Sequence, residues 1–435
     1  MKKIIEIPYA DESKRLEIKM ENLLFIAMPE LPQRPSLIDD QNEVERALLN
    51  PIGIGALQDT IRPDSTVVIL VDDFTRPTPV SRILPPVIRE LEKAGVTDSQ
   101  IRIVIARGTH RKLSTEEMKQ KIGSDIFHRF EVLNHENDKN LVELGRSTRG
   151  TPIWISRNVI DADFRIAIGS ICAHPIAGYG GGAKIVVPGV SGVKTINSNH
   201  SLCDSPNMAI GSIDNNPVRQ DMNEIAQIAH VDFLVNVILN PHKEIIKAVA
   251  GDIVQAHRNG TTIYNCLYGA RFREEADIVV VGSSPRDATF GHATFALYAA
   301  MPMVKRGGSI ILVAPCTEGA GSSEYRERFH RLATTDPTTL MNLIKNGHVD
   351  ASDGAFDYCY SKVLSKCQVI LISDSYSKTE AKEIGVDYSD SLQEAIDKEI
   401  SKIGDHAKVA VLPVGGLTVP IKERIISPQQ WRDYV

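Results

Sequence analysis

Short runs of β-branched and other apolar residues recur along the chain, and most of them end in polar or glycine-rich segments. Several runs are almost continuously apolar, which is typical of strands that are covered on both faces. Segments with helical spacing of apolar residues lie between them. The predicted strands are 66–71, 101–106, 164–169, 233–238, 276–282, 309–314, 368–373 and 408–413, and the predicted helices are 86–93, 114–122, 218–229 and 392–403.

This alternation of strands and helices predicts an α/β fold with largely parallel sheets. The chain has 435 residues, which is too long for one ordinary domain. We expect an N-terminal domain over residues 1–272 and a second α/β domain over 273–405. For the C-terminal segment 406–435, docking back on the N-terminal domain is one option. Because chemistry gathers at the carboxyl ends of parallel strands, we expect the two domains to face each other across an active-site cleft.

Composition narrows the class of protein. A hydrophobic fraction of 42% and a charged fraction of 24% are those of a soluble globular protein. The net charge of −6 argues against general nucleic-acid binding but not against a local basic pocket. The six cysteines form no CxxC pair, which argues against a zinc site or a disulfide framework. With neither a signal-peptide pattern nor an apolar run near the ~18 residues of a membrane span, we expect a cytoplasmic protein.

A glycine-rich loop that ends in a lysine is the most informative segment. Glycines allow positive φ and close backbone approach, so the loop can present N–H groups to an anion such as a phosphate. The lysine supplies either a point charge or a nucleophilic amine. No Ser or Thr follows it, so the loop is not a Walker A motif. The predicted binding residues of this segment are Gly180, Gly181, Gly182, Lys184, Pro188, Gly189 and Ser191.

Two histidines follow two different predicted strands. His110 comes after strand 101–106 and His174 after strand 164–169. Taken alone, His110 could cap the next helix, but Ser114 and Glu117 already form the pattern of a capping box. A reference pKa of ~6.5 suits imidazole to both acid and base roles. Together the two histidines predict a two-base racemase or epimerase, in which one takes a proton from one face and the other delivers a proton to the opposite face.

Asp73 and Arg76 follow the predicted strand 66–71. The planar guanidinium suits a carboxylate or a phosphate. The alternative is that the two side chains pair with each other and brace the turn.

His200 lies beyond the glycine–lysine segment and has no second ligand at a zinc-protease spacing. Spacing alone therefore gives little support for a metal there. The remaining histidines, His135 and His257 among them, are interpreted as surface or structural residues.

Five segments taken in order closely resemble the nickel-dependent lactate racemase family, and the likeness runs from about residue 10 to at least residue 320. They are Asp73–Arg76, Gly108–His110, Ala173–Pro175, Gly180–Lys184 and Asn199–His200. The resemblance implies a nickel-pincer nucleotide, made from a pyridinium mononucleotide, that is attached to Lys184 through a thioamide. It also implies that two sulfurs and one carbon of the cofactor, together with His200, hold the nickel.

The resemblance also implies a reaction. Hydride passes from C2 of a 2-hydroxy acid to the cofactor ring and returns to the other face, while His110 and His174 exchange the hydroxyl proton. Arg76 would hold the substrate carboxylate, and Asp73 would orient its neighbours. The partners implied are the small hydroxy acid and the proteins that make the cofactor.

The chain departs from the family at one place. His292 and Phe295 stand where lactate-type members carry a Gln and a Lys that contact substrate and cofactor. We therefore expect a substrate larger than lactate: an aliphatic, aromatic or sugar acid. Two other readings of the sequence stay open, a Schiff-base lyase or aldolase that uses Lys184 and a non-catalytic protein that binds a phosphate ligand on the glycine loop.

Overall fold

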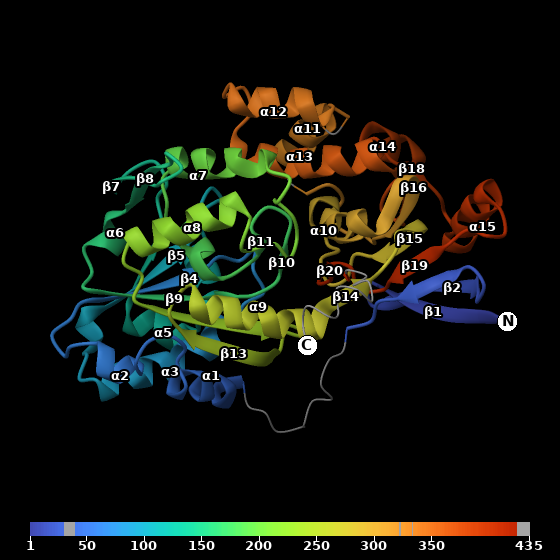
Figure 1. The fold of residues 1–435 in the computed structure, drawn as a ribbon. Coiled ribbons are helices and arrows are strands. Elements are labelled where there is room, and N and C mark those ends of the chain that lie inside the picture. The colour runs from blue at the N-terminus through green and yellow to red at the C-terminus, as the bar shows by residue number, and fades with distance from the viewer. Residues whose placement is uncertain (30–39, 322, 333, 424–435) are drawn as a thin grey trace, which may run out of the picture. The chain divides into compact units, whose positions relative to one another are not determined.

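The computed structural model describes residues 1–29, 40–321, 323–332 and 334–423 (Figure 1). The chain divides into two domains. The N-terminal domain comprises Leu31–Cys266 and Ile344–Ala355, and the C-terminal domain comprises Met1–Glu30, Leu267–Leu343 and Phe356–Val435. Each contains a six-stranded, largely parallel sheet, so the predicted α/β class is confirmed. Within the residues described, no helix combines the length and apolarity that crossing a bilayer requires.

The sheet of the N-terminal domain has the order β13-β12-β9-β4-β5-β6. All neighbours are parallel except β13, which runs antiparallel to β12. The first four predicted strands are confirmed as β4, β5, β9 and β12. The bounds are β4 (Val67–Asp72), β5 (Ile101–Ala106), β6 (Glu131–Asn134), β9 (Phe164–Ser170), β12 (Phe233–Leu239) and β13 (Ile245–Gly251).

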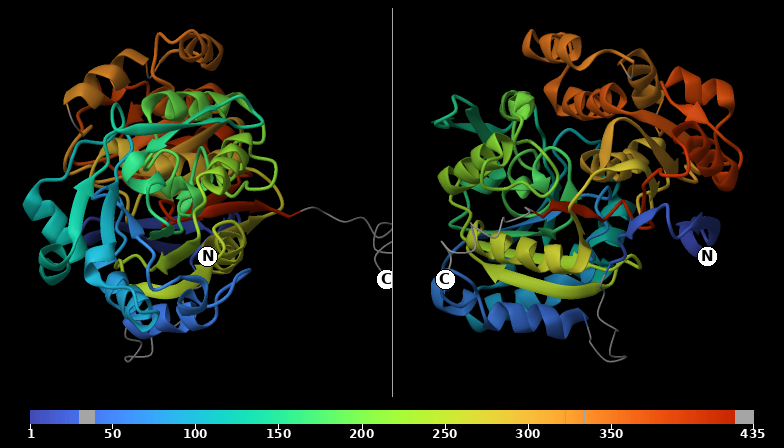
Figure 2. Two further views of the ribbon diagram at one scale, coloured as in Figure 1. Left: turned by 90° about the vertical axis from the view of Figure 1, so that its left-hand side faces the viewer. Right: turned by 45° about the vertical axis from the view of Figure 1, so that its right-hand side comes forward.

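Helices cover both faces of this sheet. Helices α1 (Asp40–Leu49) and α3 (Val80–Lys93) pack on one face, where they form a core with alternate strand residues such as Ile69 and Ile103. Figures 1 and 2 show α9 (Gln255–Tyr268) on the opposite side, with β13 between it and α1. Being covered on both faces explains why these strands are almost continuously apolar.

One helix is longer than the sequence predicts. Helix α3 begins at Val80 instead of residue 86 and contains Pro85 and Pro86. Each of these prolines removes one helical N–H donor. Burial of Val80, Ile83 and Leu84 on the face that packs against the sheet outweighs that loss.

The sheet of the C-terminal domain has the order β18-β17-β16-β15-β19-β3, and every pair in it is parallel. The last four predicted strands are confirmed as β15, β16, β17 and β19. The hairpin of β1 and β2 and helix α15 pack on one face of this sheet. The bounds are β1 (Lys2–Tyr9), β2 (Glu12–Lys19), β3 (Leu23–Ile26), β15 (Ala276–Gly282), β16 (Val304–Val313), β17 (Gln368–Ile372), β18 (Asp387–Tyr388), β19 (Val409–Leu412) and α15 (Leu392–Ile403).

The observed division of the chain differs from the predicted one at both ends. Strand β3 pairs with β19, so residues 1–30 belong to the C-terminal domain and not to a domain spanning 1–272. Within the segment 406–435, the described residues 406–423 continue the same domain, because β19 lies between β15 and β3 and β20 (Val419–Lys422) pairs with β14 (Gly269–Phe272). Residues 424–435 of that segment lie outside the described residues. Such pairings join backbones remote in the chain, and no local pattern signals them.

The remaining elements connect these layers. The shorter strands are β7 (Leu141–Arg146), β8 (Pro152–Ser156), β10 (Ala173–His174) and β11 (Gly178–Tyr179). The other helices are α2 (Leu57–Thr60), α4 (Thr115–Ile122), α5 (Ser124–Arg129), α6 (Arg157–Ile160), α7 (Val193–His200), α8 (Pro217–Ile228), α10 (Phe290–Ala300), α11 (Ser323–Leu332), α12 (Pro337–Lys345), α13 (Ala351–Lys366) and α14 (Lys378–Glu383).

Candidate active site

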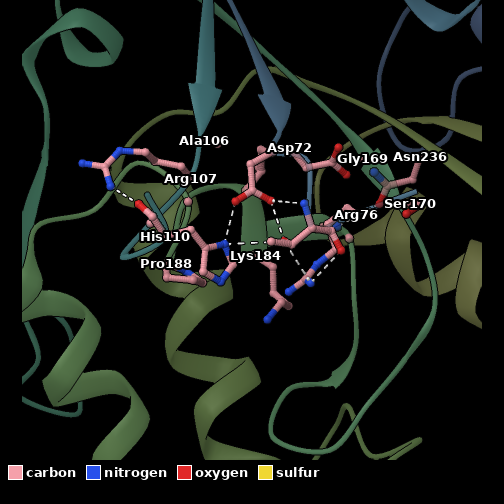
Figure 3. Close-up of a pocket in the computed structure, with 17 residues that line it drawn as sticks. Asp72, Arg76, Ala106, Arg107, His110, Gly169, Ser170, Lys184, Pro188 and Asn236 are labelled. Carbon is pink, nitrogen blue, oxygen red and sulfur yellow. Dashed lines mark hydrogen bonds and ion pairs between the residues drawn. The ribbon is translucent and has the colours of Figure 1, made fainter. Parts of the chain in front are cut away.

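A pocket of the N-terminal domain lies where β4, β5 and β9 end (Figure 3). Because these parallel strands are neighbours, the loops that follow them meet at one edge of the sheet. The residues that the sequence predicts and that line this pocket are Asp73, Arg76, His110, Gly181, Gly182, Lys184, Pro188 and Gly189. Of the other predicted residues in this domain, His174, Gly180, Ser191 and His200 are not among its lining residues.

Asp73 and His110 form a hydrogen-bonded pair in this pocket. Asp73 Oδ2 lies 2.6 Å from His110 Nδ1, and Asp73 also accepts hydrogen bonds from the main-chain and side-chain groups of Thr75. Burial opposes the charge of Asp73, but the bonds to His110 and Thr75 and the charge of Arg76 outweigh it and lower the pKa of Asp73. The ionised carboxylate therefore fixes the ring proton on Nδ1 and leaves the His110 Nε2 lone pair as a proton acceptor.

The structure does not show the alternative in which Asp73 and Arg76 brace the turn by an ion pair. The Arg76 side chain donates only long hydrogen bonds to Thr75, and no ion pair of Arg76 is found in the part of the chain that is described. Lys121 on α4 braces the loop instead, donating to the carbonyls of Arg76 and Thr78. The half-buried Arg76 guanidinium is therefore available to an anion in the pocket.

His174 contacts the loop lysine. Its Nε2 lies 3.0 Å from Lys184 Nζ. Its Nδ1 accepts hydrogen bonds from the main-chain N–H groups of Ile176 and Ala177, at 3.3 and 3.2 Å. Two donors at Nδ1 fix the proton of the neutral ring on Nε2. The two histidines thus present opposite states, an Nε2 lone pair at His110 and an Nε2–H at His174.

Most of the N–H groups that the sequence predicts as an anion cradle are engaged within the protein. Gly180 donates to the Cys172 carbonyl, Gly182 to Asn236 Oδ1 and Gly189 to the Lys184 carbonyl. Ser191 is similarly engaged, since its N–H donates to the Pro188 carbonyl and its hydroxyl to the Val186 carbonyl.

Close packing explains why glycine occupies positions 181 and 182. Gly181 and Gly182 have φ of +71° and +58°, and a Cβ at Gly182 would lie 2.7 Å from the His257 ring. The loop is therefore a tightly packed support for Lys184.

Arg219 on α8 is a residue of this region that sequence reasoning missed. Its fully buried guanidinium donates to the carbonyls of Ala177, Tyr179 and Gly181, all in the loop between His174 and Lys184. Burial lowers the pKa of Arg219 to about 9. An arginine within an amphipathic helix is ordinarily exposed, so the sequence carries no signal for this contact.

Replacing Arg219 with methionine is expected to lower the free energy of unfolding by about 2–4 kcal/mol, because three buried carbonyls lose a charged donor. Urea denaturation at pH 7.5 measures the change. Arg165→Met is the matched control, since Arg165 also donates to three main-chain carbonyls, those of Val159, Ile160 and His230, but outside the loop. Unchanged stability in Arg219→Met would show that the guanidinium does not hold the loop.

His200 has the properties of a neutral metal ligand. Its Nδ1 lies 3.0 Å from the Ile196 carbonyl, which places the ring proton on Nδ1 and the lone pair on Nε2. Burial lowers its pKa to about 3, so the ring is uncharged at neutral pH. No group of three His, Cys, Asp or Glu side chains that could hold a metal occurs among the described residues. A metal at His200 would therefore need most of its ligands from a bound molecule, and this chemistry fits a cofactor that brings its own sulfur and carbon donors.

Two further histidines are buried supports of this region, which agrees with the structural role predicted for them. His257 Nε2 lies 2.9 Å from the Gly180 carbonyl and His135 Nε2 lies 2.9 Å from the Ser191 carbonyl. Burial lowers the pKa of His257 to about 3 and that of His135 to about 4.

Acid is expected to destabilise the protein through these histidines. Their folded pKa values lie below the ~6.5 of an unfolded histidine, so their stabilising effect is complete above pH 6.5 and is lost as the pH falls toward 4. Between pH 7.5 and 5.0 each should cost about 2 kcal/mol of unfolding free energy. Urea denaturation at both pH values measures this loss. The loss should be about 2 kcal/mol smaller in His257→Asn. It should be unchanged in His128→Asn, because His128 is exposed. Equal losses in all three proteins would contradict the assignment.

His292 and Phe295 lie on α10 of the C-terminal domain. His292 Nδ1 is 3.2 Å from the hydroxyl of Thr289, the N-cap residue of that helix. Phe295 is 7% exposed and packs against Tyr298 and Phe356. The Arg286 guanidinium lies 4.3 Å from the centre of its ring, so a cation lies next to Phe295.

Known proteins resemble this chain over its whole length. Residues 9–211 match the lactate racemase N-terminal domain, and residues 272–421 match the lactate racemase C-terminal domain. The lactate racemase of Lactiplantibacillus plantarum is 31% identical over 427 residues, which are 96% of this chain and 99% of that protein. The lactate racemase of Thermoanaerobacterium thermosaccharolyticum is 28% identical, over 97% and 99% of the two chains.

Solved structures give the same result. The lactate racemase apoprotein from Thermoanaerobacterium thermosaccharolyticum superposes with a TM-score of 0.86 at 28% identity, over 97% of this chain and all of that one. A Thermotoga maritima protein shares the fold, with a TM-score of 0.66 at 18% identity, over 88% of this chain and 98% of that one. The identity and full coverage of the curated relatives show that the chain belongs to the lactate racemase family.

Proposed function

We propose that this protein is a racemase or epimerase of a 2-hydroxy acid and that it uses a nickel-pincer nucleotide attached to Lys184. One observation carries the proposal: Asp73, Arg76, His110 and Lys184 line one pocket, and His174 contacts the lysine. Family membership supports the same activity. When bound, the cofactor supplies a centre that takes up the C2 hydride and returns it.

Each protein group then has a distinct task. Arg76 binds the substrate carboxylate, since its guanidinium has no ion pair among the described residues and faces the pocket. His110, held by Asp73, accepts the hydroxyl proton at Nε2. His174, whose Nε2 carries a proton, serves as the donor for the other face. His200 offers its Nε2 lone pair to the metal.

We further propose that His292, Phe295 and the adjacent Arg286 shape the substrate preference from the C-terminal domain. An aromatic ring in place of a lysine changes the size and shape of this surface, while Arg286 keeps a cation beside it. The preferred substrate is then a hydroxy acid larger than lactate.

The test is co-expression with cofactor-making proteins, followed by intact-protein mass spectrometry and a racemisation assay. The substrates are lactate and larger aliphatic, aromatic and sugar acids, with products resolved by chiral chromatography. We expect added mass on the intact protein, located at Lys184 after digestion to peptides, and faster turnover of a larger acid than of lactate. Fast lactate turnover with no gain from larger acids would reject the substrate preference. An unmodified Lys184 with no turnover would reject the cofactor-dependent function.

The contact between His174 and Lys184 also suits a Schiff-base enzyme, which needs an amine nucleophile. Borohydride trapping in the presence of a carbonyl substrate would label Lys184 in that case, and a visible chromophore with bound nickel would not appear. The phosphate-binding alternative has less support, because the N–H donors of Gly180, Gly182, Gly189 and Ser191 are engaged within the protein.

A further inference from the structure

We propose that His174 holds Lys184 as a neutral amine, so that the apoprotein presents a preformed nucleophile for acylation by an activated carboxyl or thiocarboxyl group. The inference deepens the proposed function and rests on it only for the identity of the acyl donor. His174 then acts on Lys184 in the apoprotein, before any substrate is turned over.

The state of the His174 ring is the first step. Two main-chain N–H groups, those of Ile176 and Ala177, donate to Nδ1, and the side chain is only 2% exposed. A proton on Nδ1 would face two other donors in a buried environment, which is unfavourable. The neutral ring therefore carries its proton on Nε2.

Buried side chains fix the donors that set this state. The amide N–H of Ala177 belongs to the same peptide group as the Ile176 carbonyl, and that carbonyl accepts a 2.8 Å hydrogen bond from Asn216 Nδ2. Arg219 Nε donates to the next carbonyl, that of Ala177, at 3.0 Å. Both side chains are fully buried. The loop therefore cannot easily turn these amides away from His174.

The state of Lys184 follows from that of the ring. Nε2 and Nζ are 3.0 Å apart, so one nitrogen donates and the other accepts. An ammonium has no lone pair and could only donate, which would require a lone pair on Nε2. Since Nε2 carries the proton, the arrangement fits a neutral amine whose lone pair accepts the Nε2–H bond.

A neutral amine changes the reactivity of this lysine. Only about one in 10³ ordinary lysines is neutral near pH 7.4, because their reference pKa is ~10.4. Lys184 lines the pocket and is half-buried, so a reagent can reach it. In acylation, Nζ bonds to the carbonyl carbon and the leaving group departs with its electron pair. Nζ loses one proton to water, because His174 Nε2 already holds a proton.

Trace labelling of the apoprotein with acetic anhydride tests the proposal, with acetate as the leaving group. Acetylation of Lys184 is compared by mass spectrometry with that of the exposed Lys3 and Lys194 in the same digest, from pH 6 to 10. At pH 7 Lys184 should be acetylated at least about tenfold faster than the exposed lysines. Its acetylation rate should change little between pH 6 and 10. The exposed lysines should react about tenfold faster for each added pH unit.

The variants are His174→Ala, which removes the donor, and His174→Gln, whose amide can replace it. His174→Ala should lower the Lys184 rate at pH 7 at least about tenfold, and His174→Gln should retain part of it. His110→Ala is the matched control from the same pocket and should leave Lys184 labelling near wild type. The other charged or titratable groups at this pocket are Asp72, Asp73, Arg76 and Arg107, and His200 interacts electrostatically with Lys184. An inflection in the pH dependence of Lys184 acetylation that persists in His174→Ala belongs to one of these other groups.

Two outcomes overturn the proposal: Lys184 reacting at the rate of the exposed lysines in the wild-type protein, or an unchanged rate in His174→Ala. The first needs no variant, so it does not depend on the folding of a mutant. Neither outcome bears on the racemase assignment, which turnover by the cofactor-loaded protein tests separately.

Discussion

Lys184→Arg is expected to lower racemisation of the preferred hydroxy acid by more than about 10³-fold, to the background of the assay. Arginine cannot form the covalent attachment, because its guanidinium stays protonated at any pH a protein tolerates. The measurement is kcat of protein co-expressed with the cofactor-making proteins, together with intact mass. The modified mass should be absent.

The control for this prediction is Lys194→Arg. Lys194 is an exposed lysine at the start of α7, a few residues along the chain from the loop. Its replacement should leave both mass and kcat unchanged. Retention of more than about a tenth of the wild-type kcat by Lys184→Arg would show that the lysine is not the point of attachment.

His110→Ala is expected to lower kcat by about 10²–10⁴-fold, the range of a lost acid–base group. Asp73→Asn should cause a loss of similar size for a different reason. The asparagine amide can donate to Nδ1, which would move the ring proton to Nε2 and convert His110 from a proton acceptor to a donor. Steady-state kinetics with both enantiomers or epimers measures the effect.

The double variant separates this pairing from two independent contributions. If Asp73 acts through His110, then Asp73→Asn combined with His110→Ala should be no slower than His110→Ala alone. A multiplicative loss would show that Asp73 has a separate role. His128→Ala, at an exposed histidine, should have wild-type kcat.

The candidate site could be predicted to the extent that its residues follow strands. Asp73, His110 and Lys184 stand near the carboxyl ends of strands that the apolar pattern identifies, and neighbouring parallel strands bring those ends together. The capping box of Ser114 and Glu117 is also confirmed, so His110 is not needed to cap α4. These features depend on residues that are close together in the chain, so hydrophobic and capping patterns can predict them.

The contacts that support the site could not be predicted. Arg219 lies in a helix whose sequence is ordinary, and its three acceptors are main-chain carbonyls that no side-chain pattern reveals. The glycine pattern predicts an anion cradle, but the N–H groups of Gly180, Gly182 and Gly189 donate to Asn236 and to loop carbonyls. Glycines that permit close packing and glycines that bind a phosphate look the same in a sequence.

Local sequence is enough to predict the eight buried strands, the α/β class and the residues that can do chemistry, because side-chain type and spacing decide which positions are buried locally. Three features follow from long-range contacts instead: β3 joins β19, Arg219 holds the loop, and Nε2 has a lone pair in His110 but a proton in His174. Those outcomes depend on which backbone groups meet across long stretches of chain. Backbone hydrogen bonding is the same for every residue except proline, so it leaves little trace in the sequence.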